Sequence, residues 1–83
     1  MEINTSKGGA FQADLVIEIH SDRSLMIQLR DPNGTPLSQL AEAFEGLTAI
    51  TCEDGREYTE YTDLRILTRM AEETVQLRLY KEG

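Results

Sequence analysis

Hydrophobic and polar residues alternate along much of the chain, which predicts a protein built mainly of β-strands. Apolar side chains occupy every second position over residues 11–19, and the alternation returns over residues 25–30. A period of two is typical of a strand with one buried face. Residues 21–23 between them are polar and favour a turn, so the pattern predicts a hairpin with one shared core face. The expected pairs on that face are Ile19 with Leu25, Ile17 with Ile27, and Leu15 with Leu29.

A short helix is predicted after a turn at residues 31–34, where Pro-Asn-Gly interrupts the strand. Thr35 is the expected N-cap, and Pro36 stands in the first turn, where its missing N–H has no cost. Apolar residues then recur at helical spacing: Leu37, Leu40, Ala41 and Phe44. Gly46 is the expected helix end. A helix of about ten residues is marginal alone, so its apolar stripe should lie on a sheet.

The second half of the chain predicts four more strands. Residues 48–53 and 56–61 flank Asp54-Gly55, a strong signal for a two-residue hairpin turn of type I′. Residues 64–70 and 75–79 alternate again, and an even-length connection over residues 71–74 places their apolar sets on one face. The expected pairs there are Met70 with Val75, Thr68 with Leu77, and Ile66 with Leu79.

The sequence does not decide which face of the hairpin around Asp54-Gly55 is buried. Ile50 and Cys52 favour one face of the hairpin and Tyr58 favours the other. A β-bulge would resolve the conflict, and so would a strand buried on both sides.

Together these elements predict an α+β fold. The expected architecture is a mainly antiparallel, bent sheet or small barrel of about six strands with one covering helix, in the order β-β-α-β-β-β-β. A chain of 83 residues is expected to form a single domain over residues 1–83. Residues 1–10 are expected to be flexible or to add a short edge strand.

The charge of the chain excludes some classes of partner. Acidic residues number 15 against 8 basic ones, which gives a formal charge of -7. Nucleic-acid binding and contact with anionic membranes both need clustered Lys and Arg, so neither is expected. The apolar runs are far shorter than the ~20 residues of a membrane span. The expectation is a cytoplasmic domain without a cofactor.

No set of residues in the sequence predicts catalysis or metal binding. One cysteine and one histidine cannot form an internal disulfide or a His/Cys zinc cluster. His20 is expected in a turn, and its neighbours Ser21 and Asp22 cannot converge on it as a catalytic triad. Cys52 is expected to be a small core residue. The chain is therefore not expected to be an enzyme.

One stretch of the chain is strongly acidic, with a local charge balance of -4 over residues 53–63. Its spacing lacks the alternating oxygen ligands of a calcium loop. It is interpreted either as solvated surface or as an acidic patch that meets a basic partner. The five carboxylates are Glu53, Asp54, Glu57, Glu60 and Asp63.

A second group of residues has the composition of an interface, in which Tyr and Arg are enriched. In the predicted register, Arg65 faces Tyr80 and Leu67 faces Arg78 on the side away from the core. Such residues either pair across strands on a wet face or form a surface for a partner or a second copy. On the second hypothesis, Leu67→Asp should abolish association without unfolding the domain. The residues of this hypothesis are Arg65, Leu67, Arg69, Arg78 and Tyr80.

Several segments resemble one family. They are E-A-F-E-G-L-T-A-I-T (residues 42–51), D-G-R-E-Y-T-E-Y-T-D-L (54–64) and V-Q-L-R-L-Y-K (75–81), with F-Q-A-D and L-M-I-Q-L-R-D in the first strand pair. This pattern resembles small, functionally uncharacterised proteins encoded in phages and prophages of gut Firmicutes. That group has a helix ending in F-x-G-L and a D-G turn followed by Y-x-G-Y-T-x-L. This chain differs at Glu60, where the group usually has a glycine.

The resemblance implies a phage origin, near tail-assembly genes, and carries over no catalytic residues. The expected function is therefore that of a non-enzymatic interaction or assembly accessory protein, found in the cytoplasm or associated with the virion. Its partner would be another protein or a second copy. The alternative is a small acidic inhibitor that occupies the basic groove of a nucleic-acid-binding host protein.

Overall fold

The computed structural model describes residues 1–71 and 73–81 as one antiparallel sheet of seven strands with one helix. The elements are β1 (Glu2–Thr5), β2 (Ala10–Ile19), β3 (Ser24–Arg30), α1 (Leu37–Phe44), β4 (Ala49–Cys52), β5 (Glu57–Thr59), β6 (Tyr61–Ala71) and β7 (Thr74–Lys81). Their order across the sheet is β5-β4-β1-β2-β3-β7-β6. The α+β class, the antiparallel sheet and the single helix are confirmed. The strand count is seven because residues 2–5 form β1, which is an interior strand and not an edge.

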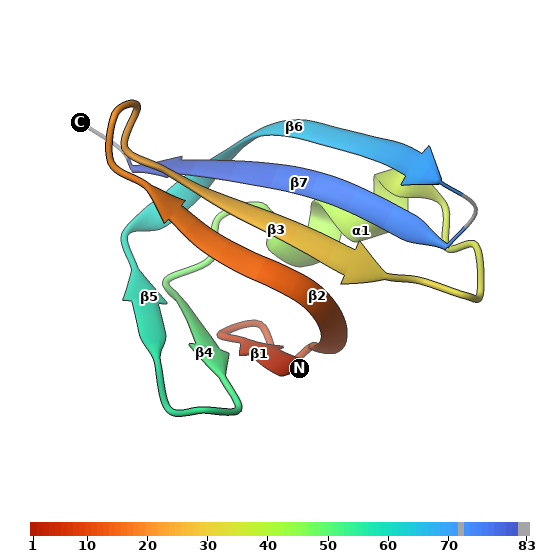
Figure 1. The fold of residues 1–83 in the computed structure, drawn as a ribbon, viewed down its shortest axis with the longest axis horizontal. Coiled ribbons are helices and arrows are strands. Elements are labelled where there is room, and N and C mark those ends of the chain that lie inside the picture. The colour runs from red at the N-terminus through yellow and green to blue at the C-terminus, as the bar shows by residue number, and fades with distance from the viewer. Residues whose placement is uncertain (72, 82–83) are drawn as a thin grey trace.

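The sheet is strongly bent and remains open. Strands β1, β4 and β5 turn away from the plane of β2, β3, β7 and β6 (Figure 1). The two edge strands, β5 and β6, are consecutive in the chain and are separated by Glu60 alone. Glu60 has a φ of 74°, in the left-handed region that glycine enters most easily. The tight bend therefore forms here without the glycine of the resembling group.

The core lies between the helix and the concave side of the sheet, called here the inner face. Strands β3 and β7 supply its centre, with Leu25, Ile27 and Leu29 paired against residues of β7 at 1% exposure or less. Helix α1 lies behind β3 and β7 in Figure 1 and buries Leu40 and Phe44 against this face. Leu37, expected on the same apolar stripe, is 36% exposed.

Both ends of the helix are fixed to β6 by hydrogen bonds. The predicted N-cap Thr35 is wrong: the helix begins one residue later, with Pro36 at the cap. Thr35 instead donates its backbone N–H (2.8 Å) and its hydroxyl (3.0 Å) to the buried carboxylate of Asp31. Arg69 of β6 donates to the carbonyl of Thr35 at 2.7 Å. At the other end, Gly46 has the expected positive φ of 70°, and its N–H donates to the carbonyl of Thr62.

The predicted register of the first hairpin is wrong by one residue. Ile17 lies opposite Met26, and Val16, not Ile17, lies opposite Ile27. The connection spans residues 20–23, one residue fewer than the predicted pairs require, and a β-bulge at Asp14 keeps Ala13 on the same face as Val16. A bulge adds one unpaired residue and exchanges the two faces of the strand beyond it.

The second hairpin shows the same kind of difference. Bulges interrupt β6 at three places, one of them at Arg65. As a result Leu67 lies opposite Leu77 on the inner face, and Ile66 lies opposite Arg78. Ala71 pairs with Thr74, so the connection is even-numbered as predicted but spans two residues and not four. The predicted pairs of Ile66, Thr68 and Met70 with β7 are wrong.

The turn at Asp54-Gly55 is a hairpin turn, but it is not of type I′. The N–H of Gly55 donates to the carbonyl of Cys52 at 2.9 Å, and the N–H of Cys52 donates to the carbonyl of Arg56 at 2.8 Å. Gly55 has a φ of 92°, whereas Asp54 has no positive φ. The loop therefore has three residues, as in a type I turn followed by a glycine bulge. This odd length places Tyr58 opposite Ile50, which resolves the open facing of that hairpin.

Candidate interaction surface

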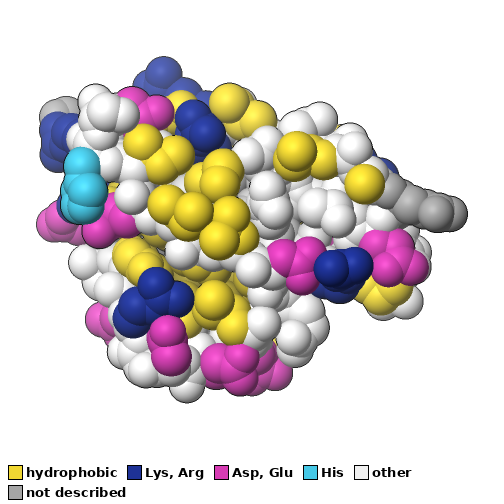
Figure 2. Space-filling model, in the orientation of Figure 1, with side chains coloured by type: hydrophobic (Ala, Val, Ile, Leu, Met, Phe, Trp, Pro, Cys, Tyr) yellow, Lys and Arg dark blue, Asp and Glu magenta, His cyan; other side chains and the backbone are white. Residues whose placement is uncertain are grey.

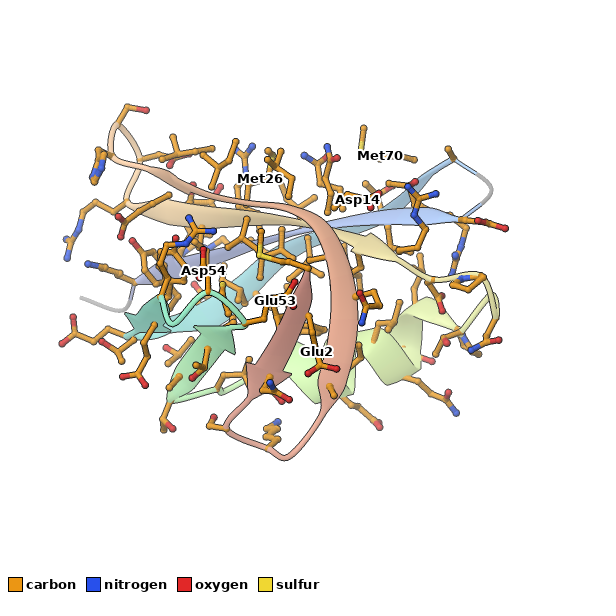
Figure 3. All side chains as sticks on the ribbon, turned by 60° about the horizontal axis from the view of Figure 1, so that its bottom comes forward. Glu2, Asp14, Met26, Glu53, Asp54 and Met70 are labelled. Carbon is orange, nitrogen blue, oxygen red and sulfur yellow. The ribbon has the colours of Figure 1, made fainter. Side chains whose placement is uncertain are left out.

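The side of β2, β3, β7 and β6 opposite the helix carries an exposed group of apolar residues; this side is called here the outer face. Figure 2 looks onto it and shows hydrophobic side chains gathered near its middle, with charged side chains around them. Ile17 is 40% exposed, Ile66 43% and Met70 55%. Figure 3 shows Met26 and Met70 on the side of the sheet away from α1. The apolar residues of the outer face are Leu15, Ile17, Ile19, Met26, Ile66 and Met70.

Pairing brings the centre of this face into one row across four strands. Ile17 of β2 lies opposite Met26 of β3, Met26 lies opposite Arg78 of β7, and Arg78 lies opposite Ile66 of β6. The Sδ atom of Met26 accepts a hydrogen bond from Gln76 at 2.8 Å. A thioether side chain is flexible and polarisable, so it adapts to a variable contact surface.

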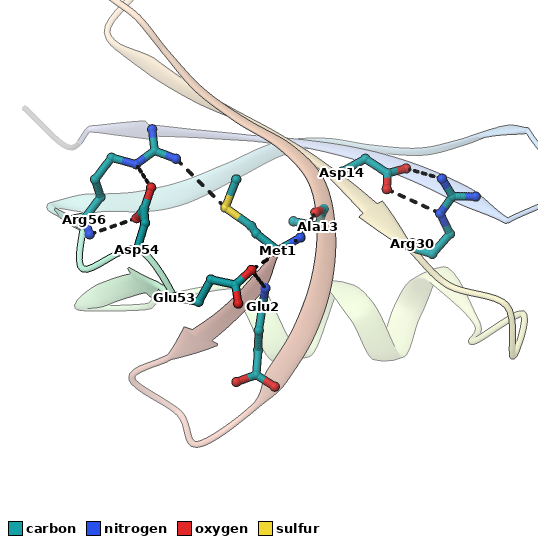
Figure 4. Close-up of polar contacts among 8 residues, drawn as sticks. All are labelled: Met1, Glu2, Ala13, Asp14, Arg30, Glu53, Asp54 and Arg56. Atoms are coloured by element: carbon teal, nitrogen blue, oxygen red, sulfur yellow. Dashed lines mark hydrogen bonds and ion pairs between the residues drawn. The ribbon is translucent and has the colours of Figure 1, made fainter.

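Three arginines in or beside this row each pair with an aspartate, and one of them, Arg30, also contacts Glu73 at 3.8 Å. Arg30 pairs with Asp14 at 2.9 Å (Figure 4), and Arg65 pairs with Asp63 at 2.9 Å. The third pair joins Arg78 and Asp22 at 3.5 Å. Exposed pairs of this kind add little to stability. Their effect on the surface is to cancel each other's charge.

The structure divides the predicted interface residues between the two faces. Arg65, Arg78 and Tyr80 lie on the outer face, where the Arg65 guanidinium stands 5.3 Å from the centre of the Tyr80 ring. Leu67 lies on the inner face and packs against the core. Arg69 is also on that side and reaches Asp31 and the helix entry. The predicted grouping of all five on one face is therefore wrong, because the bulge at Arg65 exchanges the faces of β6.

Sequence reasoning missed the apolar part of the outer face. Ile17, Ile66 and Met70 were assigned to the core sets of their strands, whereas all three are exposed. One signal for this is in the sequence: residues 15–17 and 66–67 are apolar at consecutive positions. Consecutive apolar residues place apolar side chains on both faces of a strand.

The carboxylates of residues 53–63 do not converge on one point. Glu53 accepts the N–H of Glu2 at 3.0 Å, and Asp54 pairs with Arg56 at 2.7 Å (Figure 4). Hydrogen bonding from the Arg56 backbone lowers the pKa of Asp54 below its ordinary value. Asp63 is on the outer face, Glu57 is in the edge strand β5, and Glu60 is at the bend. Within residues 1–71 and 73–81, no three His, Cys, Asp or Glu side chains are placed to hold a metal ion.

The single histidine and the single cysteine take the predicted positions. His20 lies in the turn after β2, with its side chain 88% exposed. Cys52 is 3% exposed in the core, and burial raises the pKa of its thiol. A thiol with a raised pKa is a poor nucleophile, because the thiolate is the reactive form.

Tyr61 forms a buried polar contact on the inner side of the sheet. Its hydroxyl donates to Glu18 at 2.5 Å, and its ring lies 5.0 Å from the ammonium of Lys81. Burial, helped by the nearby Glu18 carboxylate, raises the pKa of Tyr61 to about 12. The phenol therefore stays protonated at neutral pH and works as a hydrogen-bond donor.

Two hollows are present elsewhere on the molecule. One, of about 530 Å³, is lined by Arg23, Thr48, Thr59, Glu60 and Thr62. Arg23 and Glu60 are also the two non-glycine residues with positive φ in the described part of the chain. The other hollow, of about 540 Å³, is a groove between α1 and the start of β2, where the Phe11 ring packs against the Phe44 ring at a tilt of 44°, with ring centres 4.7 Å apart.

Comparisons with protein-family models, with curated proteins and with solved structures gave no significant match. Among the described residues, no helix has the length and hydrophobicity to cross a membrane. The geometry of the molecule is therefore the basis for assigning its function.

Proposed function

We propose that this chain is a non-enzymatic interaction protein that binds other protein surfaces through the outer face. One observation carries the proposal: the apolar residues Ile17, Met26 and Ile66, all at least partly exposed, lie in one row across the sheet, with Arg78 between the last two, on the side that the helix leaves uncovered. Contiguous exposed apolar patches on small proteins are typical of interaction sites. Tyr80 and the arginines beside the row are residue types enriched at interfaces.

The resemblance to phage-encoded proteins supports a role in phage assembly. In that setting the outer face would meet a structural protein of the particle or another copy of the chain. The alternative, an acidic inhibitor of a basic host protein, has less support. Asp54 and Asp63 already pair with neighbouring arginines, so fewer free charges remain to attract a basic groove.

Affinity capture with matched variants tests this proposal. The tagged chain, its Ile66→Asp variant and its Ser38→Asp variant are each incubated with lysate of a prophage-induced host. Ser38 is exposed on α1, on the other side of the molecule, so its variant adds the same charge away from the outer face. Proteins bound by the wild type and by Ser38→Asp are expected to be lost with Ile66→Asp. Identical captured sets for all three proteins would contradict the proposal.

A further inference from the structure

We infer that the occupant of the outer face is a second copy of this chain, which makes the protein a reversible homodimer. The inference rests on the proposed function and names its partner. A two-fold dimer brings the same patch of both copies together, so the patch has to be compatible with itself in shape and charge.

The distribution of charge favours self-association through this face. Each chain carries a formal charge of -7, so two copies repel each other through most orientations. On the outer face, three arginines pair with three aspartates. Arg30 has a second carboxylate partner, Glu73, at 3.8 Å. Of the other described residues, nine are acidic and five are basic, so most of the negative charge lies away from these pairs. The outer face is thus a surface that two copies can join with little electrostatic cost.

The same charge balance argues against a strongly charged partner at this face. A basic protein would be attracted to the acidic remainder of the surface, and a more acidic one would be repelled by it. A mainly apolar row whose arginine, Arg78, is paired with Asp22 instead complements another copy of the same row. Ile17, Met26 and Ile66 supply that row in both copies.

The small size of the face is typical of a weak, reversible dimer. Four strands about 4.8 Å apart and about seven residues long cover roughly 20 by 24 Å. A standard interface buries about 800 Å² on each partner, and smaller ones belong to weak or transient complexes. We therefore expect dissociation in the micromolar range, with exchange between monomer and dimer.

Sedimentation velocity over a range of protein concentrations tests the inference. The wild type and Ser38→Asp are expected to shift from monomer to dimer as concentration rises, and Ile66→Asp to raise the dissociation constant at least tenfold. Asp at position 66 would lie opposite Arg78, so the variant should keep its fold, which circular dichroism checks. Added salt should strengthen the wild-type dimer, because it screens the repulsion between the two -7 charges.

Two outcomes overturn the inference: a wild type that stays monomeric at all concentrations, and a dimer that Ile66→Asp leaves intact. The capture experiment separates these failures from failure of the proposed function. If the wild type is monomeric but still captures proteins that Ile66→Asp loses, the outer face binds a different partner and the proposed function stands. If neither dimer nor Ile66-dependent capture is found, both proposals are wrong.

Discussion

The two faces of the four-stranded part of the sheet are built from the same kinds of residue, yet they have different environments. On the inner face, Ile27 and Leu77 are 0% exposed beneath the helix. On the outer face, Ile17 and Ile66 are 40% and 43% exposed. The difference comes from what covers each face and not from the strands themselves. An aliphatic row that no part of its own chain covers is surface available to a partner.

The largest expected difference in stability between the two faces comes from substituting two adjacent residues of β6, Leu67 and Ile66. Leu67→Asp places a carboxylate against Leu77 in the core, which should destabilise the fold by about 3–5 kcal/mol. Ile66→Asp places the same group beside Arg78 and should cost less than about 1 kcal/mol. Urea unfolding of both variants measures the difference. The sequence-based expectation that Leu67→Asp would leave the fold intact is revised accordingly, and equal effects of the two variants would contradict the assignment of faces.

A second comparison sets the buried carboxylate Asp31 against the exposed carboxylate Asp14. Asp31 accepts two hydrogen bonds from Thr35 and pairs with Arg69, so Asp31→Ala should cost about 2–3 kcal/mol. Asp14 pairs with Arg30 at the surface, and Asp14→Ala should cost no more than about 1 kcal/mol. Thermal unfolding midpoints measure both. A loss of stability for Asp14→Ala that exceeds the loss for Asp31→Ala would contradict this ranking of the two carboxylates.

Removing the Tyr61 hydroxyl should lower the free energy of unfolding by an intermediate amount, and this loss should depend on pH. Tyr61→Phe removes the hydrogen bond to Glu18 and should cost about 1–2 kcal/mol at neutral pH. The pKa of Tyr61 is raised from 10.0 to about 12, so the folded state holds this proton more tightly than the unfolded state. Its contribution is complete below pH 10 and falls as pH rises toward 12. Unfolding at several alkaline pH values should show a steeper loss for the wild type than for Tyr61→Phe, and parallel curves would contradict the shift.

The smallest expected effect is at the bend between the two edge strands. Glu60 has a φ of 74°, a conformation that costs an ordinary residue about 1 kcal/mol more than glycine. Glu60→Gly should therefore stabilise the fold, by less than about 1 kcal/mol once glycine's greater freedom in the unfolded chain is included. Glu57→Gly, in strand β5, is the control and should be destabilising. A loss of stability in Glu60→Gly would mean that the Glu60 side chain contributes contacts of its own.

The sequence predicted the elements well and their facing poorly. Alternation, the Pro-Asn-Gly turn and Gly46 located the strands and both ends of the helix to within a few residues. The facing failed at Asp14 and Arg65, because a bulge is one extra residue that no local pattern announces when both neighbours are apolar. Of the residues in the interface hypothesis, Arg65, Arg78 and Tyr80 do share one face, and Arg78 and Tyr80 belong to a strand that pairs with β3 without a bulge. Leu67 and Arg69 lie beyond the bulge, and the same reasoning placed them on the wrong side.

The order of the strands also determines when the protein can fold during translation. Strand β7 lies between β3 and β6, so β3 has a free edge and an uncovered apolar side until residues 74–81 have left the ribosome. Helix α1 and β6 are synthesised earlier, but β6 can join the sheet only by pairing with β7, which in turn pairs with β3. Completion of the sheet therefore has to wait until β7 has been made. A stalled product that stops before residue 74 would present the open edge of β3 to chaperones, to proteases and to other unfinished chains.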